Sequence, residues 1–334
     1  MSLSDTRFIL LTNWLSQYFK TEVSVELICG DASFRRYFRV QHLANSYIVS
    51  DSPIELVPIL PFIQMADAYK KAGLLVPEII AQDDKNGFVL QSDLGDEQLL
   101  NQLNEETATQ LYQKALALLP QVAAVTETEN GPLPTYDQAF VKRELDIFVE
   151  WLLIKHLGIT LSEQDKSIIE NAFAELTVSA LEQPAFGMHR DFHSRNILVV
   201  DKALALIDFQ DAVIGPVTYD AVSLLRDCYI KWPVEVIDTL KHEHFTLCQN
   251  NQLISESVTF EQYQSWFDLM GLQRHIKAAG IFARLNHRDA KSGYLKDIPL
   301  TLSYIVEIAA LYPKLMPFSQ WVEQHVLTRM SDKG

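Results

Sequence analysis

The sequence is poor in cysteine and in positive charge. Its three cysteines, Cys29, Cys228 and Cys248, have spacings typical neither of a metal site nor of a disulfide framework. Lys and Arg number 28 against 43 Asp and Glu, which gives a formal charge of −15. Nucleic-acid-binding surfaces need clustered Lys and Arg. We therefore expect reduced thiols and no nucleic-acid partner, although a small local nucleotide site remains compatible with this charge.

Long apolar runs are also missing. No stretch reaches the roughly 20 residues that a membrane-spanning helix needs. The first residues, MSLSDTRFILLTNWL, carry Asp5 and Arg7 and show no cleavage site of a secretory signal. An apolar fraction of 48% over 334 residues is ordinary for a globular protein with two lobes. We expect a cytoplasmic protein with no membrane partner.

The order of the expected elements predicts an α+β fold with a small β-rich N-terminal lobe. A helix over 4–19, with Ser4 as its N-cap, precedes three strands in VSVELICGDASFRRYFRV and SYIVSDSP. A helix over 54–72 and strands over 76–80 and 87–91 complete the lobe. After Gly95 the pattern is mainly helical: 105–124, 138–157, 162–181, 219–231, 233–250, 261–286, 300–311 and 317–330. We predict a nucleotide-binding lobe over 1–93 and a catalytic and substrate-binding lobe over 94–334.

One segment, MHRDFHSRNILVVDKALALIDFQD, carries most of the polar residues that indicate chemistry. Apolar runs at 197–200 and 204–207 flank Asp201 and Lys202, which predicts a hairpin. Such a hairpin returns Asn196 and Asp208 to the same end. Their oxygen atoms are suitable ligands for a hard cation.

The start of this segment matches H-R-D-x-x-x-x-N at His189, Asp191 and Asn196. In that pattern the Asp receives or orients the proton of an attacking hydroxyl, and the Asn binds magnesium. Asp208, in a D-F-Q setting, supplies the second metal ligand. Two alternatives are a polar hairpin whose Asp and Asn only cap turns, and a zinc hydrolase built on H-x-D-x-H. The other histidines, in expected helices, add no zinc-ligand pattern.

The expected nucleotide contacts lie in the first lobe. The turn Gly30-Asp31-Ala32-Ser33 can cover phosphates with backbone N–H groups and the Ser33 hydroxyl, although it lacks repeated glycines. The third strand, YIVSDSP, has no lysine to hold the phosphates, so Arg35, Arg36 or Arg39 is expected to replace it. The candidates for nucleotide binding are Ser33, Phe34, Arg36 and, at a hinge between the lobes, Gln91, Asp93 and Leu94. A kinase-shaped protein without catalysis is a further alternative.

His193 extends the match to H-x-D-x-H-x-x-N, with His189, Asp191 and Asn196 at the other positions. Aminoglycoside and choline kinases carry this motif. The chain resembles this small-molecule branch of the kinase fold. GDASFRRYFRV, KRELDIFVEWLL, IDFQDAVIGPVTYDAVSLLRDCYIKWP and GIFARLNHRDAKSGYLKDIP resemble, more closely, the anomeric amino-sugar kinases of bacterial cell-wall recycling. The resemblance implies a bilobal protein-kinase-like fold, use of ATP and Mg²⁺, and phosphorylation of the C1 hydroxyl of N-acetylmuramate and N-acetylglucosamine. A kinase of choline, an aminoglycoside or another sugar is the alternative.

The resemblance also indicates supporting residues. His189, His193 and Asp220 are expected to brace the catalytic loop. A sugar needs hydrogen-bonding and charged side chains around it. The candidates are Glu144, Glu150, Arg226, Asp227 and Arg288, and the lactyl carboxylate of N-acetylmuramate would need an arginine that the sequence does not identify.

Overall fold

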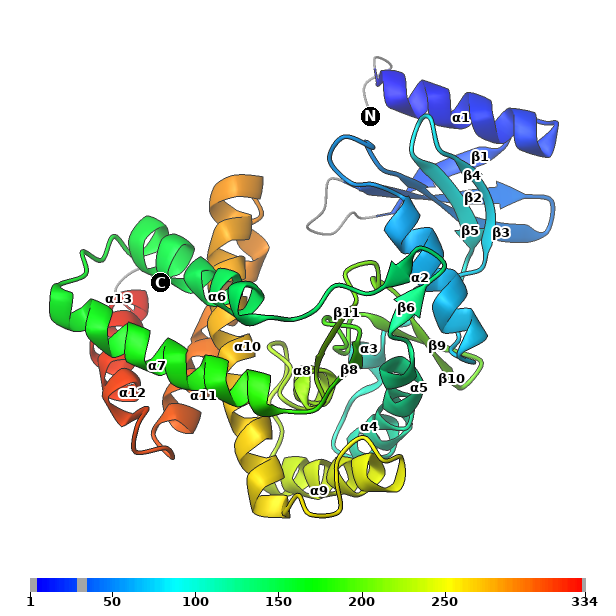
Figure 1. Ribbon diagram of the computed structural model, residues 1–334. Helices are drawn as coiled ribbons and strands as arrows, with labels where there is room; N and C mark the ends of the chain where they lie inside the picture. The colour runs from blue at the N-terminus through cyan, green and yellow to red at the C-terminus, as the bar shows by residue number, and fades with distance from the viewer. Residues whose placement is uncertain (1–4, 29–34, 332–334) are drawn as a thin grey trace. The chain divides into compact units, whose positions relative to one another are not determined.

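The computed structural model describes residues 5–28 and 35–331 (Figure 1). Contacts within the chain define two compact units. The first unit contains residues 1–101, 127–131 and 195–211, and the second contains 102–126, 132–194 and 212–334. The β-rich and helical parts follow the predicted order. The division also assigns the hairpin at 197–206 to the first unit, whereas the lobes expected from the sequence meet near Asp93.

The first unit is built on a five-stranded antiparallel sheet with the strand order β1-β2-β3-β5-β4. Its strands are β1 Ser24–Leu27, β2 Arg36–His42, β3 Asn45–Asp51, β4 Ile79–Asp83 and β5 Phe88–Ser92. The expected turn at Gly30–Ser33 lies outside the described residues. The alternating and β-branched composition of these segments explains why they form strands.

Two helices accompany the sheet. Helix α1, Thr6–Phe19, begins at Asp5, whose side chain accepts the Phe8 N–H; the predicted cap, Ser4, lies outside the described residues. Leu11 and Leu15 of α1 share a core with strand residues that include Phe38 and Phe88. Figure 1 shows α1 lying along the sheet. Helix α2, Leu60–Lys71, has Pro61 in its first turn, where proline is tolerated.

The predicted hairpin is present as β9, Ile197–Val200, and β10, Ala203–Leu206. Asp201 and Lys202 turn the chain with φ of 48° and 70°, as a two-residue hairpin turn requires. The hairpin is tied into the first unit through Leu75, whose C=O accepts the Leu206 N–H at 2.9 Å. Phe209, just after the hairpin, stacks on Phe62 of α2 with ring centroids 5.1 Å apart.

The second unit is mainly helical. It contains one two-stranded antiparallel sheet, β8 Ala185–Met188 with β11 Val213–Pro216. Its larger helices are α4 Ala108–Leu116, α5 Leu119–Ala124, α6 Gln138–Ile147, α7 Glu163–Glu182, α8 Tyr219–Leu225, α9 Val234–Asn250, α10 Phe260–Asp289, α11 Ile298–Ala309 and α12 Met316–Val322. The shorter elements of the chain are α3 Leu99–Gln102, β6 Glu127–Thr128, β7 Gly131–Pro132, η1 Phe148–His156, η2 Ser292–Asp297, η3 Glu323–Leu327 and α13 Thr328–Ser331.

The helix predicted over 105–124 is instead two helices, because Pro120 cannot continue the first one and stands in the first turn of α5. The predicted start of α7 is confirmed. Ser162 and Asp165 cap it reciprocally, each side chain bonding to the backbone N–H of the other.

Helix α10 is the centre of the second unit, and it crosses α6–η1 closely at Gly280. A Cβ atom at position 280 would lie 2.6 Å from the Phe148 backbone N, at the point where α6 continues as the π-helix η1. Only glycine permits this approach of the two backbones. This close crossing fixes the position of α10 along α6–η1, and with it the positions of Lys277 and Arg274.

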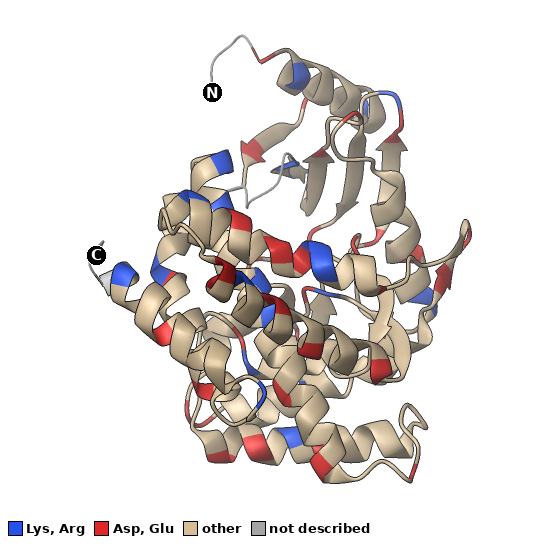
Figure 2. Ribbon diagram, turned by 60° about the vertical axis from the view of Figure 1, so that its left-hand side comes forward, with Lys and Arg blue, Asp and Glu red and all other residues tan. Residues whose placement is uncertain are grey.

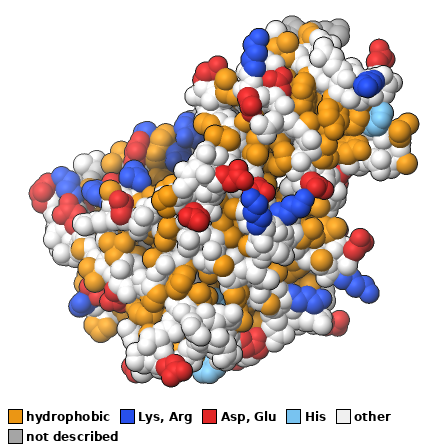
Figure 3. Space-filling view, turned by 45° about the vertical axis from the view of Figure 1, so that its right-hand side comes forward, with side chains coloured by type: hydrophobic (Ala, Val, Ile, Leu, Met, Phe, Trp, Pro, Cys, Tyr) orange, Lys and Arg blue, Asp and Glu red, His pale blue; other side chains and the backbone are white. Residues whose placement is uncertain are grey.

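The surface mixes charges of both signs. Along the helices, Lys and Arg are interspersed with Asp and Glu (Figure 2). On the face drawn in Figure 3, basic side chains occur in small groups between acidic and hydrophobic ones. A search of residues 5–28 and 35–331 found no helix with the length and apolar character needed to cross a membrane.

Candidate active site

The loop that carries Asp191 starts where β8 ends, and a buried carboxylate holds its beginning. Asp220, in the first turn of α8, accepts the backbone N–H groups of His189 and Arg190 at 2.7 and 3.0 Å. Arg190 has a φ of 75°, a conformation that costs energy for a residue with a side chain. The two hydrogen bonds from consecutive N–H groups stabilise this conformation immediately before Asp191.

A second buried carboxylate holds the other end of the loop. Asp227 accepts the backbone N–H of Ser194 at 3.0 Å and the Ser194 hydroxyl at 2.5 Å. Between the two ends, the His193 N–H donates to the Asp191 C=O at 3.0 Å. The half-buried His193 side chain packs edge-on against Tyr229, with ring centroids 5.6 Å apart. The side chain of Asp191 is thus presented on a loop fixed at both ends.

Behind this loop lies a buried ion-pair network centred on Glu144 of α6. Glu144 pairs with Arg190 and with Lys277 of α10, each at 2.9 Å. It also accepts hydrogen bonds from Tyr136 at 2.7 Å and from Gln273 at 3.1 Å. Lys277 in turn donates to the Tyr219 hydroxyl at 3.0 Å. These bonds satisfy Glu144 and connect the catalytic loop to α6 and α10.

The charges of this network set the protonation of the acidic side chains. Burial raises the pKa of Asp191, but the positive charges of Lys277 and Arg190 outweigh it and lower that pKa to about 2. The same balance lowers the pKa of Glu144 to about 2. For Asp220, burial dominates over its two backbone donors and raises the pKa to about 7. Asp191 is therefore ionised at neutral pH and able to accept a proton.

The two predicted metal ligands lie together in the first unit. The Asn196 C=O accepts the Ile207 N–H at 3.1 Å, which places Asn196 beside the residue that precedes Asp208. Asp208 has a φ of 64°, and its Oδ1 accepts a hydrogen bond from the Gln210 side chain at 2.9 Å. A carboxylate and an amide oxygen are hard donors, so this pair fits Mg²⁺. Among residues 5–28 and 35–331, no three His, Cys, Asp or Glu side chains form a group that could hold a metal ion.

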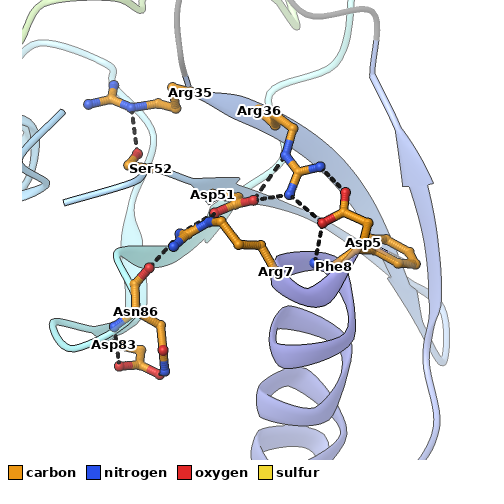
Figure 4. Close-up of polar contacts among 9 residues, drawn as sticks. All are labelled: Asp5, Arg7, Phe8, Arg35, Arg36, Asp51, Ser52, Asp83 and Asn86. Carbon is orange, nitrogen blue, oxygen red and sulfur yellow. Dashed lines mark hydrogen bonds and ion pairs between the residues drawn. The ribbon is translucent and has the colours of Figure 1, made fainter. Parts of the chain in front are cut away.

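The structure places the predicted nucleotide-binding residues in different surroundings. Ser33 and Phe34 lie outside the described residues. Arg36 pairs with Asp5 and Asp51, and Arg7 from α1 also pairs with Asp51 (Figure 4). Gln91 is buried on β5, and Leu94 is half-buried after it. Asp93 pairs with Arg39 at 2.7 Å and accepts hydrogen bonds from Ser46 and the Gly95 N–H.

Each predicted sugar-binding residue has a partner within the chain. Glu144 and Asp227 have the contacts described above. Arg226 pairs with Asp268 at 2.5 Å, in a buried position. Glu150 pairs with Lys155 at 2.8 Å and Arg288 with Asp289 at 2.9 Å, both at exposed sites. Exposed pairs of this kind are weakly held, so Glu150 and Arg288 can exchange partners at little cost, whereas breaking the contacts of the three buried residues costs more.

Sequence reasoning did not identify Gln273, Arg274 and Lys277. All three are buried side chains of α10. Three long polar residues close together in the middle of a helix could have indicated this site, because such residues are rarely buried without a specific partner.

The five-stranded antiparallel sheet of the first unit and the mainly helical second unit have the composition of a protein-kinase-like fold. The ionised Asp191 and the two hard oxygen donors of the following hairpin fit the chemistry of a phosphotransferase. The chain belongs to the phosphotransferase enzyme family, whose family model matches residues 24–249. This match confirms the resemblance to aminoglycoside phosphotransferases and choline kinases, and the protein is a small-molecule kinase.

Three relatives support a more specific placement. A protein of Pseudomonas aeruginosa described as N-acetylmuramate/N-acetylglucosamine kinase is 38% identical, over 93% of this chain and 94% of its own length. Proteins with the same description from Pseudomonas putida and Neisseria meningitidis serogroup B are 35% and 34% identical. The alignments cover 96% of this chain and 97% of the Pseudomonas putida protein, and 93% of both chains for the Neisseria meningitidis protein.

Solved structures support the fold. Choline kinase LicA from Streptococcus pneumoniae matches with a TM-score of 0.62 and 14% identity, over 90% of this chain and 99% of its own. An ADP-bound aminoglycoside phosphotransferase matches with a TM-score of 0.61 and 13% identity, over 92% and 99%. At this identity the likeness concerns the fold alone, and it confirms the predicted kinase-like architecture.

Proposed function

We propose that the protein transfers the γ-phosphoryl group of ATP to the C1 hydroxyl of N-acetylmuramate and N-acetylglucosamine. The products are the α-1-phosphates, and the reaction serves peptidoglycan recycling in the cytoplasm. The observation that carries this proposal is the similarity, at 34–38% identity over more than nine tenths of the chain, to three kinases described by these two substrates.

In this proposal Asp191 orients the anomeric hydroxyl and receives its proton. Because the transition state of phosphoryl transfer is loose, the nucleophile needs little activation before the bond forms. A weakly basic carboxylate with a pKa of about 2 is suited to such a late proton transfer. The Glu144 network and the carboxylates of Asp220 and Asp227 keep the loop in place, so little reorganisation is needed when substrate binds.

Asn196 and Asp208 would hold Mg²⁺, which supplies charge neutralisation between the transferred and leaving phosphates. We assign the adenine-binding hinge to Gln91, Asp93 and Leu94, between a nucleotide-binding lobe over 1–93 and a catalytic lobe over 94–334. Contacts with Arg39 and Ser46 hold the Asp93 side chain in this segment. Ser33 and Phe34 belong to the proposed phosphate-covering turn.

The alternative acceptors are choline, an aminoglycoside or another sugar, because solved kinases of choline and aminoglycosides share the fold. The test is a panel of these acceptors with ATP and Mg²⁺, with the position of the new phosphate followed by ³¹P NMR. We expect turnover of both amino sugars and a signal from phosphate on C1. Phosphate on C6, or turnover of choline alone, would overturn the anomeric assignment and leave the kinase assignment intact.

A further inference from the structure

Three arginines, Arg35, Arg36 and Arg39, lie at or near strand β2. Arg36 pairs with Asp5 and with Asp51, whose side chain is 1% exposed. Arg39 pairs with Asp93 at 2.7 Å and with Asp96 at 2.7 Å. A guanidinium with two carboxylate partners has most of its donors in use. These contacts give Arg36 and Arg39 the role of joining elements of the first unit.

Arg35 has different surroundings. Its side chain leaves the chain on another side from Arg36 and reaches Ser52, the residue after β3 (Figure 4). Arg35 is 4% exposed, and its Nε donates to the Ser52 hydroxyl at 2.9 Å. Its guanidinium carbon lies 5.3 Å from the centre of the Phe62 ring. The positive charge of Arg35 is therefore fixed at the end of the third strand, the strand that lacks a lysine.

Gln210 connects Arg35 to the proposed metal site. The Gln210 side-chain oxygen accepts from Arg35 Nη1 at 3.4 Å, and its nitrogen donates to Asp208 Oδ1 at 2.9 Å. One side chain thus spans the distance between the guanidinium and the metal-binding carboxylate. Phe62 packs against both Arg35 and Phe209, the residue between Asp208 and Gln210. All of these residues belong to the first unit.

We propose that Arg35 binds the phosphates of the nucleotide and replaces the lysine that kinases of this fold use on the third strand. A buried guanidinium one side chain away from a metal-binding carboxylate is placed where a metal-bound phosphate group would lie. Guanidinium groups bind phosphate oxygens through two parallel hydrogen bonds, which a single ammonium cannot do. This inference rests on the proposed use of ATP, but not on the identity of the sugar.

Binding of ADP with Mg²⁺, measured by isothermal titration calorimetry, tests this role without a sugar. We expect Arg35→Met to weaken ADP binding about 10-fold to 100-fold, the range for loss of hydrogen bonds to a charged group. Arg35→Lys should recover part of the loss. Arg7→Met is the matched control, since it removes a cation of the same unit that pairs with Asp51 and donates to the Asn86 C=O. It should lower the unfolding temperature and leave ADP affinity unchanged.

Because Arg35 is buried, each variant is first compared with the wild type by circular dichroism. A folded Arg35→Met protein that binds ADP within about twofold of the wild type overturns the proposal. So does a loss of affinity in Arg36→Met that exceeds the loss in the Arg35 variants. A wild-type protein that binds ADP but phosphorylates no sugar would contradict the proposed substrate and not this role of Arg35.

A second observation, in the second unit, concerns Arg274 of α10. Its neighbours Gln273 and Lys277 bond to Glu144, whereas Arg274 turns to the face of Tyr219, with its guanidinium carbon 5.1 Å from the ring centre. Arg274 is 7% exposed, and its Nε is buried without a hydrogen-bond partner. Within the described part of the chain, Arg274 forms no ion pair with a carboxylate.

The position of Arg274 relates it to the catalytic loop. Tyr219 also accepts a hydrogen bond from Lys277 and directly precedes Asp220, which holds the loop. The charge of Arg274 contributes to the lowered pKa of Asp191. One helical turn further along α10, Ala278 is half-exposed, although every other residue from Trp266 to Gly280 is buried. Ala278 lies four residues after Arg274, on the same helix face, so the partly exposed position of this stretch is next to Arg274.

We infer that Arg274 binds the lactyl carboxylate of N-acetylmuramate. Arg274 acts on Asp191 through its charge but forms no direct ion pair within the described residues, so the desolvation cost of its buried guanidinium would be offset further by an anionic ligand. Of the two proposed sugars, only N-acetylmuramate carries a carboxylate. This inference rests on the proposed function, because it needs an acceptor of that kind.

Steady-state kinetics with both sugars separate this role from a structural one. Arg274→Gln should raise KM for N-acetylmuramate about 10-fold or more, and Arg274→Lys less, while KM for N-acetylglucosamine stays within about threefold. An equal rise of KM for both sugars, or an unchanged KM for both in a folded variant, would overturn the assignment of Arg274 to the lactyl carboxylate. If the wild type phosphorylated neither sugar, the proposed function would fail instead.

Discussion

The Asp227 carboxylate accepts both the backbone N–H and the hydroxyl of Ser194, at 3.0 and 2.5 Å. Both residues are buried, and the other oxygen of the carboxylate accepts the Tyr229 N–H at 3.2 Å. Asp227 therefore acts on the catalytic loop in the same way as Asp220 does at its other end. The sequence suggested Asp227 as a candidate sugar ligand, which stays a prediction, and the contacts of its carboxylate predict a positioning role as well.

Replacing Asp227 with Asn should lower kcat while KM for ATP changes little. Both Ser194 groups donate to Oδ2, and an amide oxygen there can accept them only as weaker, uncharged hydrogen bonds. The amide NH2 would then face the Tyr229 N–H, which donates to the other carboxylate oxygen at 3.2 Å. We expect kcat to fall about 10-fold and unfolding stability to fall by about 1–3 kcal/mol. Urea unfolding and steady-state kinetics measure the two effects. Ser194→Ala keeps the N–H contact, so its kcat and unfolding stability should fall less than those of Asp227→Asn. A larger fall in Ser194→Ala would contradict the positioning role of Asp227.

Asp191→Asn should nearly abolish phosphoryl transfer. Removal of a general base lowers rates by about 10²–10⁴-fold, and the amide keeps the size of the side chain. Calorimetric titration with ADP and Mg²⁺ should show affinity close to that of the wild type, because Asp191 is not assigned to the nucleotide. Turnover within threefold of the wild type would be incompatible with the proposed role of Asp191.

Asp208→Ala should remove the response of nucleotide binding to Mg²⁺. In the wild type we expect ADP affinity to rise when the metal is added, since the Asp208 carboxylate would hold the cation, which would neutralise charge on the phosphates. Asp201→Asn, at the other end of the same hairpin, is the control, because Asn tolerates the positive φ of this turn. An unchanged metal response in Asp208→Ala would place the metal elsewhere.

Acid should destabilise the protein through Glu144. Its pKa falls from a usual 4.5 to about 2 on folding, so the folded state binds fewer protons than the unfolded state between these values. The stabilisation is complete above pH 4.5 and is lost as the pH falls towards 2. Denaturant unfolding between pH 7 and pH 3 should show a smaller pH dependence in Glu144→Gln than in the wild type, although the variant is less stable at pH 7. Equal pH dependence in both proteins would contradict the ion pairs with Arg190 and Lys277.

The local elements could be read from the sequence because their signals are local. The Asp201-Lys202 turn and its flanking apolar runs predicted the β9–β10 hairpin, and Ser162 predicted the start of α7. The pairing of Asn196 with the residue before Asp208 followed from that hairpin. Pro120 also indicates a break in the helix, because proline cannot continue a helix from the preceding turn. The prediction of one helix over 105–124 did not use this residue and was therefore wrong.

The partners of the charged residues could not be read in the same way. Arg35, Arg36 and Arg39 are equivalent in sequence, and only the fold shows that Asp5 and Asp51 take Arg36. Glu144 and Lys277 are far apart in the chain, and their ion pair depends on how α10 crosses α6. Local patterns give the direction of a side chain but not the identity of a distant partner, so the role of each charge had to come from tertiary structure.

Gly280 limits how the sugar preference of this enzyme can be engineered. A library on α10 can vary Ala278 and Ile281, whose side chains are half-exposed. Position 280 has to stay glycine, because any Cβ would meet the Phe148 backbone at 2.6 Å and push the helix away from η1. That displacement would carry Lys277 and Arg274 with it, so a substitution chosen only to alter specificity would also disturb the charges around Asp191.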